Sequence, residues 1–555
     1  YTLVVSNSLG VASASAWLTL VPASAPGTSL TTRHWFGGGL DGGEPDGLAP
    51  AGPDLFYGTT RAGGDWNQGT VFACDIHGAC VRLASFAGTN GSSPRAAPVP
   101  GADGRYYGTT FQGGAHDQGT VFALTPAGAL HTLHAFTAAD DGAHPAAGLL
   151  AGDDGSFYGT ASAGGAFGYG SVFRITTNGA FTTLHAFTGG LDGKSPAGAL
   201  VRGADGGLYG LTPAGGAFDQ GCFFRITAAG ELTPLYSFTG GRDGSSPVGT
   251  LALGSDGNFY GCTATGGLGW SGTVFQITPA GALTTLHPFG DLLLKDGVRP
   301  AAGVMQSCDG NFYGTTRTDY LGGYGTVFRV SPNGGVFTTL LYFDGCNDGA
   351  LPRAALIEDA AGHLYGTTAC GGPCYAGQGT LFRLSFDGAP AITTQPACQA
   401  VVPGACAQFS VAVTGARPLV YQWQRNGTNL WDDANISGSA QRNLILHSAS
   451  PADAGLYRVT LTNAFGAVTS AVARLTVVPP PVFLSAARSN STLALTWSAI
   501  PGQQYRLQQR PGLEAAAWTN LGKIVVPTSN TVTLTDNVGS LSRRFYRVVL
   551  LPQGP

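Results

Sequence analysis

The chain of 555 residues contains 87 glycines and 33 prolines, yet only 11% of its residues are charged and its net charge is −4. Single domains usually stop growing at about 250–300 residues, so several domains are expected. Many turn-forming residues with few charges are typical of short β-strands rather than of solvated helices. No basic cluster favours nucleic acid as a partner, and no apolar run reaches the roughly 18 residues that a membrane span needs.

Residues 1–22 form the first predicted element. Tyr1, Asn7 and Gly10 have the same spacing as Tyr457, Asn463 and Gly466 near the end of a later module, and both segments continue into a Leu-Thr-Leu/Val-Val-Pro strand. Because two strands alone cannot bury a core, we expect this segment to be the last hairpin of a truncated module of the same kind.

A repeat of about 50 residues fills residues 28–390. Its Tyr-Gly dipeptides begin 50 to 53 residues apart, at Tyr57, Tyr107, Tyr158, Tyr209, Tyr260, Tyr313 and Tyr365. We number these copies 1 to 7. Each copy has four short stretches of alternating apolar and polar residues, separated by turn residues, which predicts four antiparallel strands. Seven such units predict an all-β fold with a seven-bladed β-propeller. A parallel β-helix is the main alternative, but its rungs are shorter.

Copy 7 lacks a fourth strand, whereas residues 29–36 before copy 1 match the fourth strand His131–Phe136 of copy 2. We therefore expect residues 29–36 to pair with Leu381–Ser385 and to close the propeller, because this pairing removes two exposed sheet edges.

The loops between the second and third strands should emerge at the same end as the links between blades; we call this end the loop face. These loops combine aromatic rings with small polar groups, which suits a sugar or a peptide. The candidate ligand-binding residues are Asp65, Trp66, Gln68, His116, Asp117, Tyr169, Phe218, Asp219, Trp270, Tyr324 and Tyr375. The alternative is that these rings fold back over their own hairpins.

Other repeated residues have structural explanations. An Asp-Gly pair recurs at Asp103, Asp154, Asp205, Asp256 and Asp309, where we expect type I′ turns rather than catalytic or calcium sites. A histidine recurs at His34, His134, His185 and His287, where we expect cross-strand packing rather than a ligand. The Tyr-Gly tyrosines are expected to fill the space between blades.

Three of the possible cysteine pairs are close in sequence and are predicted disulfides: Cys74 with Cys80, Cys370 with Cys374, and Cys398 with Cys406. Disulfides favour an oxidising compartment. A zinc site would need a second Cys or His pair near Cys370 and Cys374, and none follows. No metal or other cofactor is therefore expected, and the pairing of Cys222, Cys262, Cys308 and Cys346 stays open.

Residues 391–478 contain Trp423 and the motif Asp453-Ala-Gly-Leu-Tyr457. They resemble the immunoglobulin-like modules of bacterial surface proteins, in which such a tryptophan lies in the core and such a tyrosine forms a corner. The usual inter-sheet cysteines are absent, since Val459 stands two residues after Tyr457. By the same resemblance, residues 1–22 are the end of an immunoglobulin-like module. Residues 482–551 follow a proline linker and look like a second, fibronectin-like β-sandwich.

The Asp-Gly-x-x-Tyr-Gly-Thr and Gly-Thr-Val-Phe motifs of residues 28–390 resemble those of GloVer (Gloeobacter/Verrucomicrobia-type) tandem-repeat proteins. This resemblance implies a secreted or cell-surface bacterial location and no settled activity. We expect a monomeric binding or adhesion protein that recognises a polysaccharide or a surface protein. The alternatives are a propeller glycoside hydrolase or lyase that uses two of Asp65, Asp117 and Asp219, and a rigid spacer in a long adhesin-like chain. No residue is assigned as catalytic.

Overall fold

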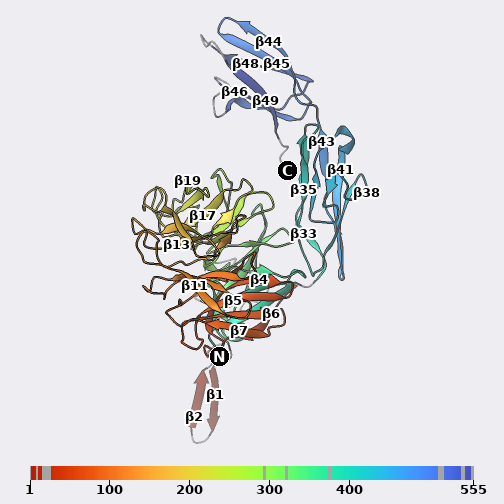
Figure 1. Ribbon diagram of the computed structural model, residues 1–555. Helices are drawn as coiled ribbons and strands as arrows, with labels where there is room; N and C mark the ends of the chain where they lie inside the picture. The colour runs from red at the N-terminus through yellow and green to blue at the C-terminus, as the bar shows by residue number, and fades with distance from the viewer. Residues whose placement is uncertain are drawn as a thin grey trace. The chain divides into compact units, whose positions relative to one another are not determined.

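The computed structural model describes residues 2–7, 10–15, 25, 27–291, 296–318, 323–372, 377–386, 388–510, 518–538 and 544–551. The chain divides into two compact units, 1–387 and 388–555. Nearly all regular structure in both units is β-strand (Figure 1), as the all-β expectation required.

The first unit holds one four-stranded sheet for each of copies 1 to 5 and a five-stranded sheet for each of copies 6 and 7, counted over its described residues. Strands follow chain order within each sheet, except that the last sheet ends on β3. The sheets of copies 1 to 4 are β4 (Gly43–Gly52), β5 (Leu55–Ala62), β6 (Thr70–Asp75) and β7 (Cys80–Ser85); β8 (Val99–Pro100), β9 (Tyr106–Thr110), β10 (Thr120–Leu124) and β11 (Leu130–Ala135); β12 (Leu150–Ala151), β13 (Phe157–Ala161), β14 (Ser171–Ile175) and β15 (Phe181–Ala186); and β16 (Val201–Arg202), β17 (Leu208–Thr212), β18 (Cys222–Ile226) and β19 (Leu232–Ser237).

The sheets of copies 5 to 7 follow the same plan, with the first strand split in two in copies 6 and 7. They are β20 (Ser245–Leu253), β21 (Phe259–Thr265), β22 (Thr273–Ile277) and β23 (Leu283–Pro288); β24 (Val298–Pro300), β25 (Met305–Gln306), β26 (Phe312–Thr318), β27 (Thr326–Val330) and β28 (Phe337–Tyr342); and β29 (Ala350–Pro352), β30 (Ile357–Glu358), β31 (Leu364–Cys370), β32 (Thr380–Phe386) and β3 (Thr28–Trp35). The hairpin β1 (Thr2–Asn7) and β2 (Gly10–Ser15) forms a separate two-stranded sheet.

Strand β3 supplies the fourth strand of the copy 7 sheet. It pairs antiparallel with β32, from Thr28 opposite Phe386 to Trp35 opposite Thr380. The register shifts once along this pair, between Thr32 and His34. The other six copies have a register shift at the corresponding point between their third and fourth strands. β3 is therefore a fourth strand like the other six, although it precedes its sheet by more than 300 residues.

Aromatic rings join neighbouring sheets. Tyr107 of copy 2 stacks on Phe157 of copy 3 at 4.2 Å between ring centroids, and Tyr365 of copy 7 packs against Phe56 of copy 1 at 4.7 Å. The glycine after each tyrosine is required by packing, because a Cβ on Gly58 would lie 2.3 Å from Cζ of Phe72 in the next strand. The Tyr-Gly dipeptide thus places a large ring on one face of the sheet and leaves room for a phenylalanine on the other.

The Asp-Gly turns differ from the type I′ prediction, which is wrong. In these turns only the glycine has a positive φ, such as +78° at Gly104. Type I′ requires positive φ at both central residues. Instead, the aspartate Oδ1 accepts a hydrogen bond from the backbone N–H two residues later, as from Arg105 to Asp103 at 3.1 Å. The side chain stabilises the turn without a left-handed aspartate.

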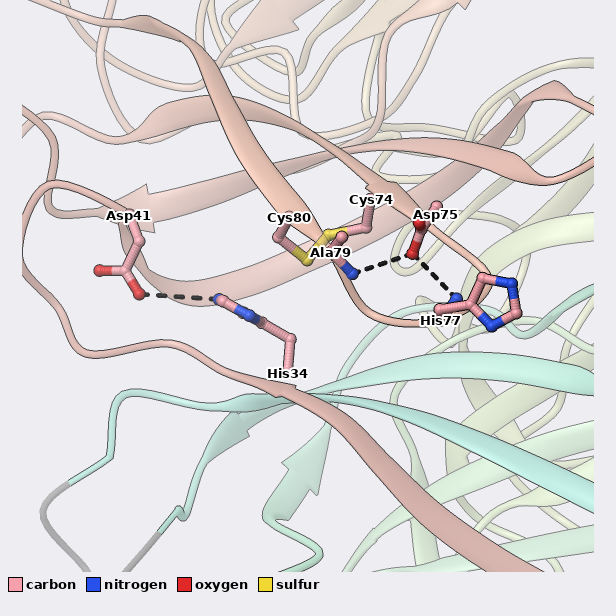
Figure 2. Close-up of a disulfide and its surroundings, with 7 residues drawn as sticks. All are labelled: His34, Asp41, Cys74, Asp75, His77, Ala79 and Cys80. Atoms are coloured by element: carbon pink, nitrogen blue, oxygen red, sulfur yellow. Dashed lines mark hydrogen bonds and ion pairs between the residues drawn. A yellow bond between two sulfur atoms is a disulfide. The ribbon is translucent and has the colours of Figure 1, made fainter.

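A disulfide joins Cys74 of β6 to Cys80 of β7, which are directly opposite each other (Figure 2). In the turn between them, the carboxylate of Asp75 accepts hydrogen bonds from the backbone N–H groups of His77 and Ala79, both 2.9 Å long. Other copies place apolar pairs at this position, such as Leu124 opposite Leu130. The disulfide therefore occupies a core position that packing alone fills elsewhere.

The prediction of a disulfide between Cys398 and Cys406 is wrong, since both are free thiols. The prediction relied on the short distance between the two cysteines along the chain. The strands that follow the two cysteines belong to different sheets, with β34 paired to β43 and β35 paired to β40. Cys374 lies outside the described residues. Cys222, Cys262 and Cys346 are free thiols, and the first two are buried.

The second unit begins with three sheets around a core that contains Trp423 and Tyr457. The Tyr457 hydroxyl donates to the carbonyl oxygen of Asp453 at 2.6 Å, as a tyrosine corner does. The ring of Phe409 stacks on Tyr457 at 4.6 Å, so apolar packing holds the sheets together. The elements are β33 (Ala391–Thr394), β34 (Gln399–Val401), β35 (Ala407–Ser410), β36 (Ala412–Thr414), β37 (Val420–Arg425), β38 (Thr428–Asn429), β39 (Ile436–Ser437), β40 (Asn443–Leu446), η2 (Pro451–Asp453), β41 (Gly455–Asn463), β42 (Gly466–Thr469) and β43 (Ala473–Val477).

Two three-stranded sheets follow, in the orders β44-β45-β48 and β47-β46-β49. Trp497 and Tyr505 lie in the core between them. Their strands are β44 (Phe483–Ser489), β45 (Thr492–Ser498), β46 (Gln504–Arg510), β47 (Thr519–Val525), β48 (Thr531–Asn537) and β49 (Phe545–Leu551).

Candidate functional site

The loops between the second and third strands share one conformation in copies 1, 2 and 4. Asn67, Asp117 and Asp219 occupy the same loop position with φ between +53° and +57°. The Oδ1 atom of each accepts a hydrogen bond from the first glycine of its loop, at 2.8 to 2.9 Å. These side chains therefore stabilise the loop, and a Gly-Gly start followed by Asn or Asp is the sequence signal for it.

Each loop is hydrogen-bonded to the link that enters the next copy. A carbonyl oxygen in the loop accepts the N–H of the residue before the link proline, at 2.6 to 2.9 Å in all seven cases. The series includes Gln68 to Ser93 between copies 1 and 2, and Gln378 to Glu44 between copies 7 and 1. Loops and links therefore lie at one end of the sheets, the loop face, and the series of contacts is cyclic.

Four large rings on the described part of the loop face are more than half exposed. They are Trp66, Phe167, Phe218 and Trp270, at 65%, 59%, 58% and 74% of their full surface. Tyr169 and Tyr324 are less exposed and lie over link glycines, since a Cβ on Gly189 would meet the ring of Tyr169 at 2.8 Å. The rings thus divide into four that extend into solvent and two that fold back.

The remaining predicted residues differ in exposure. His116 is exposed and Gln68 is half-buried, while Tyr375 lies outside the described residues. Phe167 was not among the predicted ligand residues, although it occupies the same loop position as Trp66 and Phe218. Alignment of the loops from their glycine pairs is the signal that identifies it.

The three loop carboxylates do not form a paired acid and base. Asp65 lies two residues before the position that Asp117 and Asp219 share, so the three are not equivalent. Asp65 forms an ion pair with Arg82 at 2.6 Å, and this hydrogen bond lowers its pKa. Asp219 forms an ion pair with Lys194 at 2.7 Å. General acid catalysis needs a raised pKa, which this geometry does not favour at Asp65 or Asp219.

The repeated histidines each contact an aspartate of the following link. The distance from the histidine Nε2 to the aspartate carboxylate varies from pair to pair. It is 3.7 Å for His34 with Asp41, 3.0 Å for His134 with Asp141, 3.1 Å for His185 with Asp192 and 2.7 Å for His287 with Asp296. The same aspartates bind the link backbone, as Asp192 does at the N–H of Thr188. Polar bonding to the link, rather than cross-strand packing alone, explains the repeated histidine.

The link between copies 6 and 7 contains a carboxyl pair that sequence reasoning missed. Asp344 stands where copies 2 to 4 have Thr137, Thr188 and Thr239, and its side chain hydrogen-bonds that of Asp348. Burial and this hydrogen bond raise the pKa of Asp348 to about 8. Two carboxyls in direct contact are closer than the roughly 5 Å that a retaining glycosidase keeps between its pair. Their arrangement therefore fits a shared proton within the link.

The shared proton predicts a pH dependence of stability. Asp348 stays protonated up to about pH 8 when folded, but would lose its proton near pH 4 when unfolded. Its contribution to the free energy of unfolding is therefore complete below about pH 4 and is lost as the pH rises through 8. In Asp344→Thr, the pKa of Asp348 should fall, because its carboxyl neighbour is replaced by a hydroxyl that can donate a hydrogen bond, as Thr188 donates to Asp192.

We expect the melting temperature of Asp344→Thr to exceed that of the wild type by a few degrees at pH 8.5, with little difference at pH 5. Differential scanning calorimetry at the two pH values measures this. Parallel pH profiles for the two proteins would contradict the shared proton.

The described residues offer neither a metal centre nor a membrane-spanning helix. No group of three or more His, Cys, Asp or Glu side chains there is arranged to hold a metal ion. Among the same residues, no helix has the length and apolar character required to cross a membrane.

The repeats and the tyrosine-corner module define a class of multi-module β-protein. The Gloeobacter/Verrucomicrobia repeat matches residues 13–218 and 196–395, which together are more than half of the chain. The chain therefore belongs to the Gloeobacter/Verrucomicrobia repeat family. Residues 390–477 match the immunoglobulin I-set domain, which confirms the immunoglobulin-like expectation. These modules fit an extracellular or cell-surface protein.

Three individual proteins are similar to short segments of the chain. Endoglucanase C of Cellulomonas fimi is 36% identical over 89 residues, which are 16% of this chain and 8% of that protein. The chain thus matches only a small part of this relative's length. Two similar solved structures are the titin M10–obscurin-like 1 Ig complex, 33% identical over 17% of this chain and 98% of that one, and titin M4, 28% identical over 17% and 100%; the TM-score is 0.16 for both.

Proposed function

We propose that residues 28–390 form a seven-bladed β-propeller closed by β3. The supporting observation is a closed series of seven hydrogen bonds between loops and links. They connect each copy to the next, and the bond between Gln378 and Glu44 connects the last copy to the first. A cavity lined by all seven copies is consistent with the central channel of such a fold. Residues 391–478 and 482–551 are an immunoglobulin-like and a fibronectin-like module attached to this propeller.

The propeller binds a polysaccharide outside the cell through its loop face. The observation that carries this proposal is the set of four exposed rings, Trp66, Phe167, Phe218 and Trp270. Exposed rings beside amide and backbone polar groups suit a ligand with apolar patches framed by hydroxyls. The 89-residue similarity to a protein named an endoglucanase is compatible with a polysaccharide partner. The Cys74–Cys80 disulfide supports an oxidising, extracellular location.

Binding rather than hydrolysis is favoured by the carboxylates. Asp117 and Asp219 accept hydrogen bonds from their own loops, and Asp65 is paired with Arg82. These contacts favour a binding and adhesion role over hydrolysis.

The test removes two of the rings. We expect Trp66→Ala with Trp270→Ala to weaken binding to a polysaccharide at least about tenfold, since truncated aromatic contacts typically cost over 1 kcal/mol each. A glycan array identifies a bound polysaccharide, and isothermal titration measures its affinity. Trp431→Ala is the matched control, because Trp431 is 72% exposed but belongs to the immunoglobulin-like module. Equal affinity of the double variant and the wild type for the polysaccharide would contradict the proposal.

A further inference from the structure

A cavity of about 460 Å³ is lined by one segment from each of the seven copies of the repeat. The first layer of its wall consists of the residue after each link proline. These residues are Asp46, Arg95, Ala146, Ala197, Val248, Ala301 and Arg353. Since the residue before each proline is hydrogen-bonded to a loop, this layer lies at the loop-face end of the cavity.

The first layer is charged on one side and apolar on the other. Copies 7, 1 and 2 are neighbours and contribute Arg353, Asp46 and Arg95, whereas copies 3 to 6 contribute only alanine and valine. Arg61, at the end of β5, also lines the cavity. In the repeat, small apolar residues suffice to build this wall, so the charges are not needed for the fold.

The positive charges in this cluster exceed the negative ones. Arg61 is paired with Asp46, and Arg353 is paired with Glu44 at 2.9 Å. Arg95 has no carboxylate partner among the described residues. Three guanidinium groups therefore face two carboxylates, which leaves one positive charge uncompensated.

Arg95 is held in place without being neutralised. Its guanidinium lies 3.2 Å above the centroid of the Phe111 ring, and its Nε is buried with no hydrogen-bond partner. Phe111 is itself fixed by His144, whose Nδ1 lies 2.9 Å from the Phe111 carbonyl oxygen. Burial and the nearby charge of Arg61 lower the pKa of Arg95 to about 10, so it remains charged at neutral pH. A buried donor that lacks a partner is unfavourable until a ligand supplies an acceptor.

We propose that Arg95, flanked by Arg61 and Arg353, binds the carboxylate of an acidic sugar residue at the loop-face end of the cavity. This inference rests on the proposed polysaccharide function and specifies its substrate class as a uronate-containing polymer. A guanidinium fork matches the two oxygens of a carboxylate. One uncompensated charge suits a carboxylate better than a phosphate, which carries about −1.5 to −2. The opposite wall, with Ala146, Ala197 and Val248, offers apolar contact to the sugar ring.

The test compares polygalacturonate with its carboxyl-reduced, neutral counterpart by isothermal titration against the whole chain. We expect the wild type to bind the acidic polymer at least about tenfold more tightly, because charge-assisted hydrogen bonds contribute about 1.5–3 kcal/mol. Arg95→Met keeps an unbranched side chain over Phe111 and should bind both polymers equally. Arg105→Met is the control, since Arg105 follows a tight turn at the opposite end of its sheet, and it should keep the preference.

The outcomes separate the two proposals. Equal binding of both polymers by the wild type would overturn the carboxylate site and leave the polysaccharide function standing, whatever Arg95→Met does. A preference that survives in a folded Arg95→Met, checked by its melting temperature, would overturn the role of Arg95. Binding of neither polymer would overturn the carboxylate site, and the glycan array then decides whether the polysaccharide function stands.

Discussion

Deletion of residues 28–36 is expected to lower the melting temperature of the first unit by about 10 °C or more. The deletion removes β3 and leaves β32 as an unpaired edge. It also removes Phe36, which is 1% exposed and packs against Phe72 at 5.0 Å between ring centroids. Truncation of such a phenylalanine alone typically costs about 3–5 kcal/mol. Differential scanning calorimetry measures the change.

Removal of residues 2–15 is the matched control, because β1 and β2 pair only with each other. This truncation should leave the main transition unchanged. Phe36→Ala should give an intermediate result, because the strand stays in place while the buried ring that follows it is removed. An unchanged melting temperature after deletion of residues 28–36 would show that the copy 7 sheet is stable without its fourth strand.

The second large effect is expected for Gly58→Ala. A Cβ at this position would lie 2.3 Å from the Phe72 ring and 2.7 Å from the backbone oxygen of Gly47. The backbone contact cannot be relieved by a side-chain rotation, so the substitution should cost about 3 kcal/mol, the upper end of ordinary overpacking. Chemical denaturation of the variant and the wild type gives the difference in the free energy of unfolding.

Gly39→Ala is the control for this experiment. Nothing lies within 4 Å of its Cβ position, and it is not among the residues with positive φ. The control should change stability by less than about 0.5 kcal/mol. If both variants were equally stable, the packing of the Tyr-Gly dipeptide against the third strand would be wrong.

The pattern of strands is accessible from the sequence because local chemistry sets it. The period of the Tyr-Gly dipeptides marks the second strand of every copy, and the similarity of residues 29–36 to His131–Phe136 identifies a displaced fourth strand. Trp423 and Tyr457 identify the immunoglobulin-like module, because their spacing follows from its sheet geometry. These features depend on alternation and spacing, which a linear sequence displays.

The roles of individual polar side chains are not accessible in the same way. The sequence allows Asp117 to be an acid or base, but its hydrogen bond to Gly113 depends on how the loop turns back on itself. The Asp344–Asp348 pair and the arginine cluster depend on which copies are neighbours. The pairing of Cys398 with Cys406 was wrong because distance along the chain does not indicate the sheet to which a residue belongs. Departures from the repeat are the useful sequence signal, since Asp344, Arg95 and Arg353 each replace a residue that other copies share.

The antiparallel pairing of β3 with β32 also determines how the first unit would respond to tension. Thr28, where the chain enters this pair, is opposite Phe386, where the chain leaves it. A force that pulls on the chain from both sides would load this terminal pair first and then break the hydrogen bonds one after another, as a zipper opens. Two strands pulled past each other along their length would instead load all of their hydrogen bonds at the same time and would resist a higher force. Under load, the first unit should therefore open at this seam at low force, before its other sheets unfold.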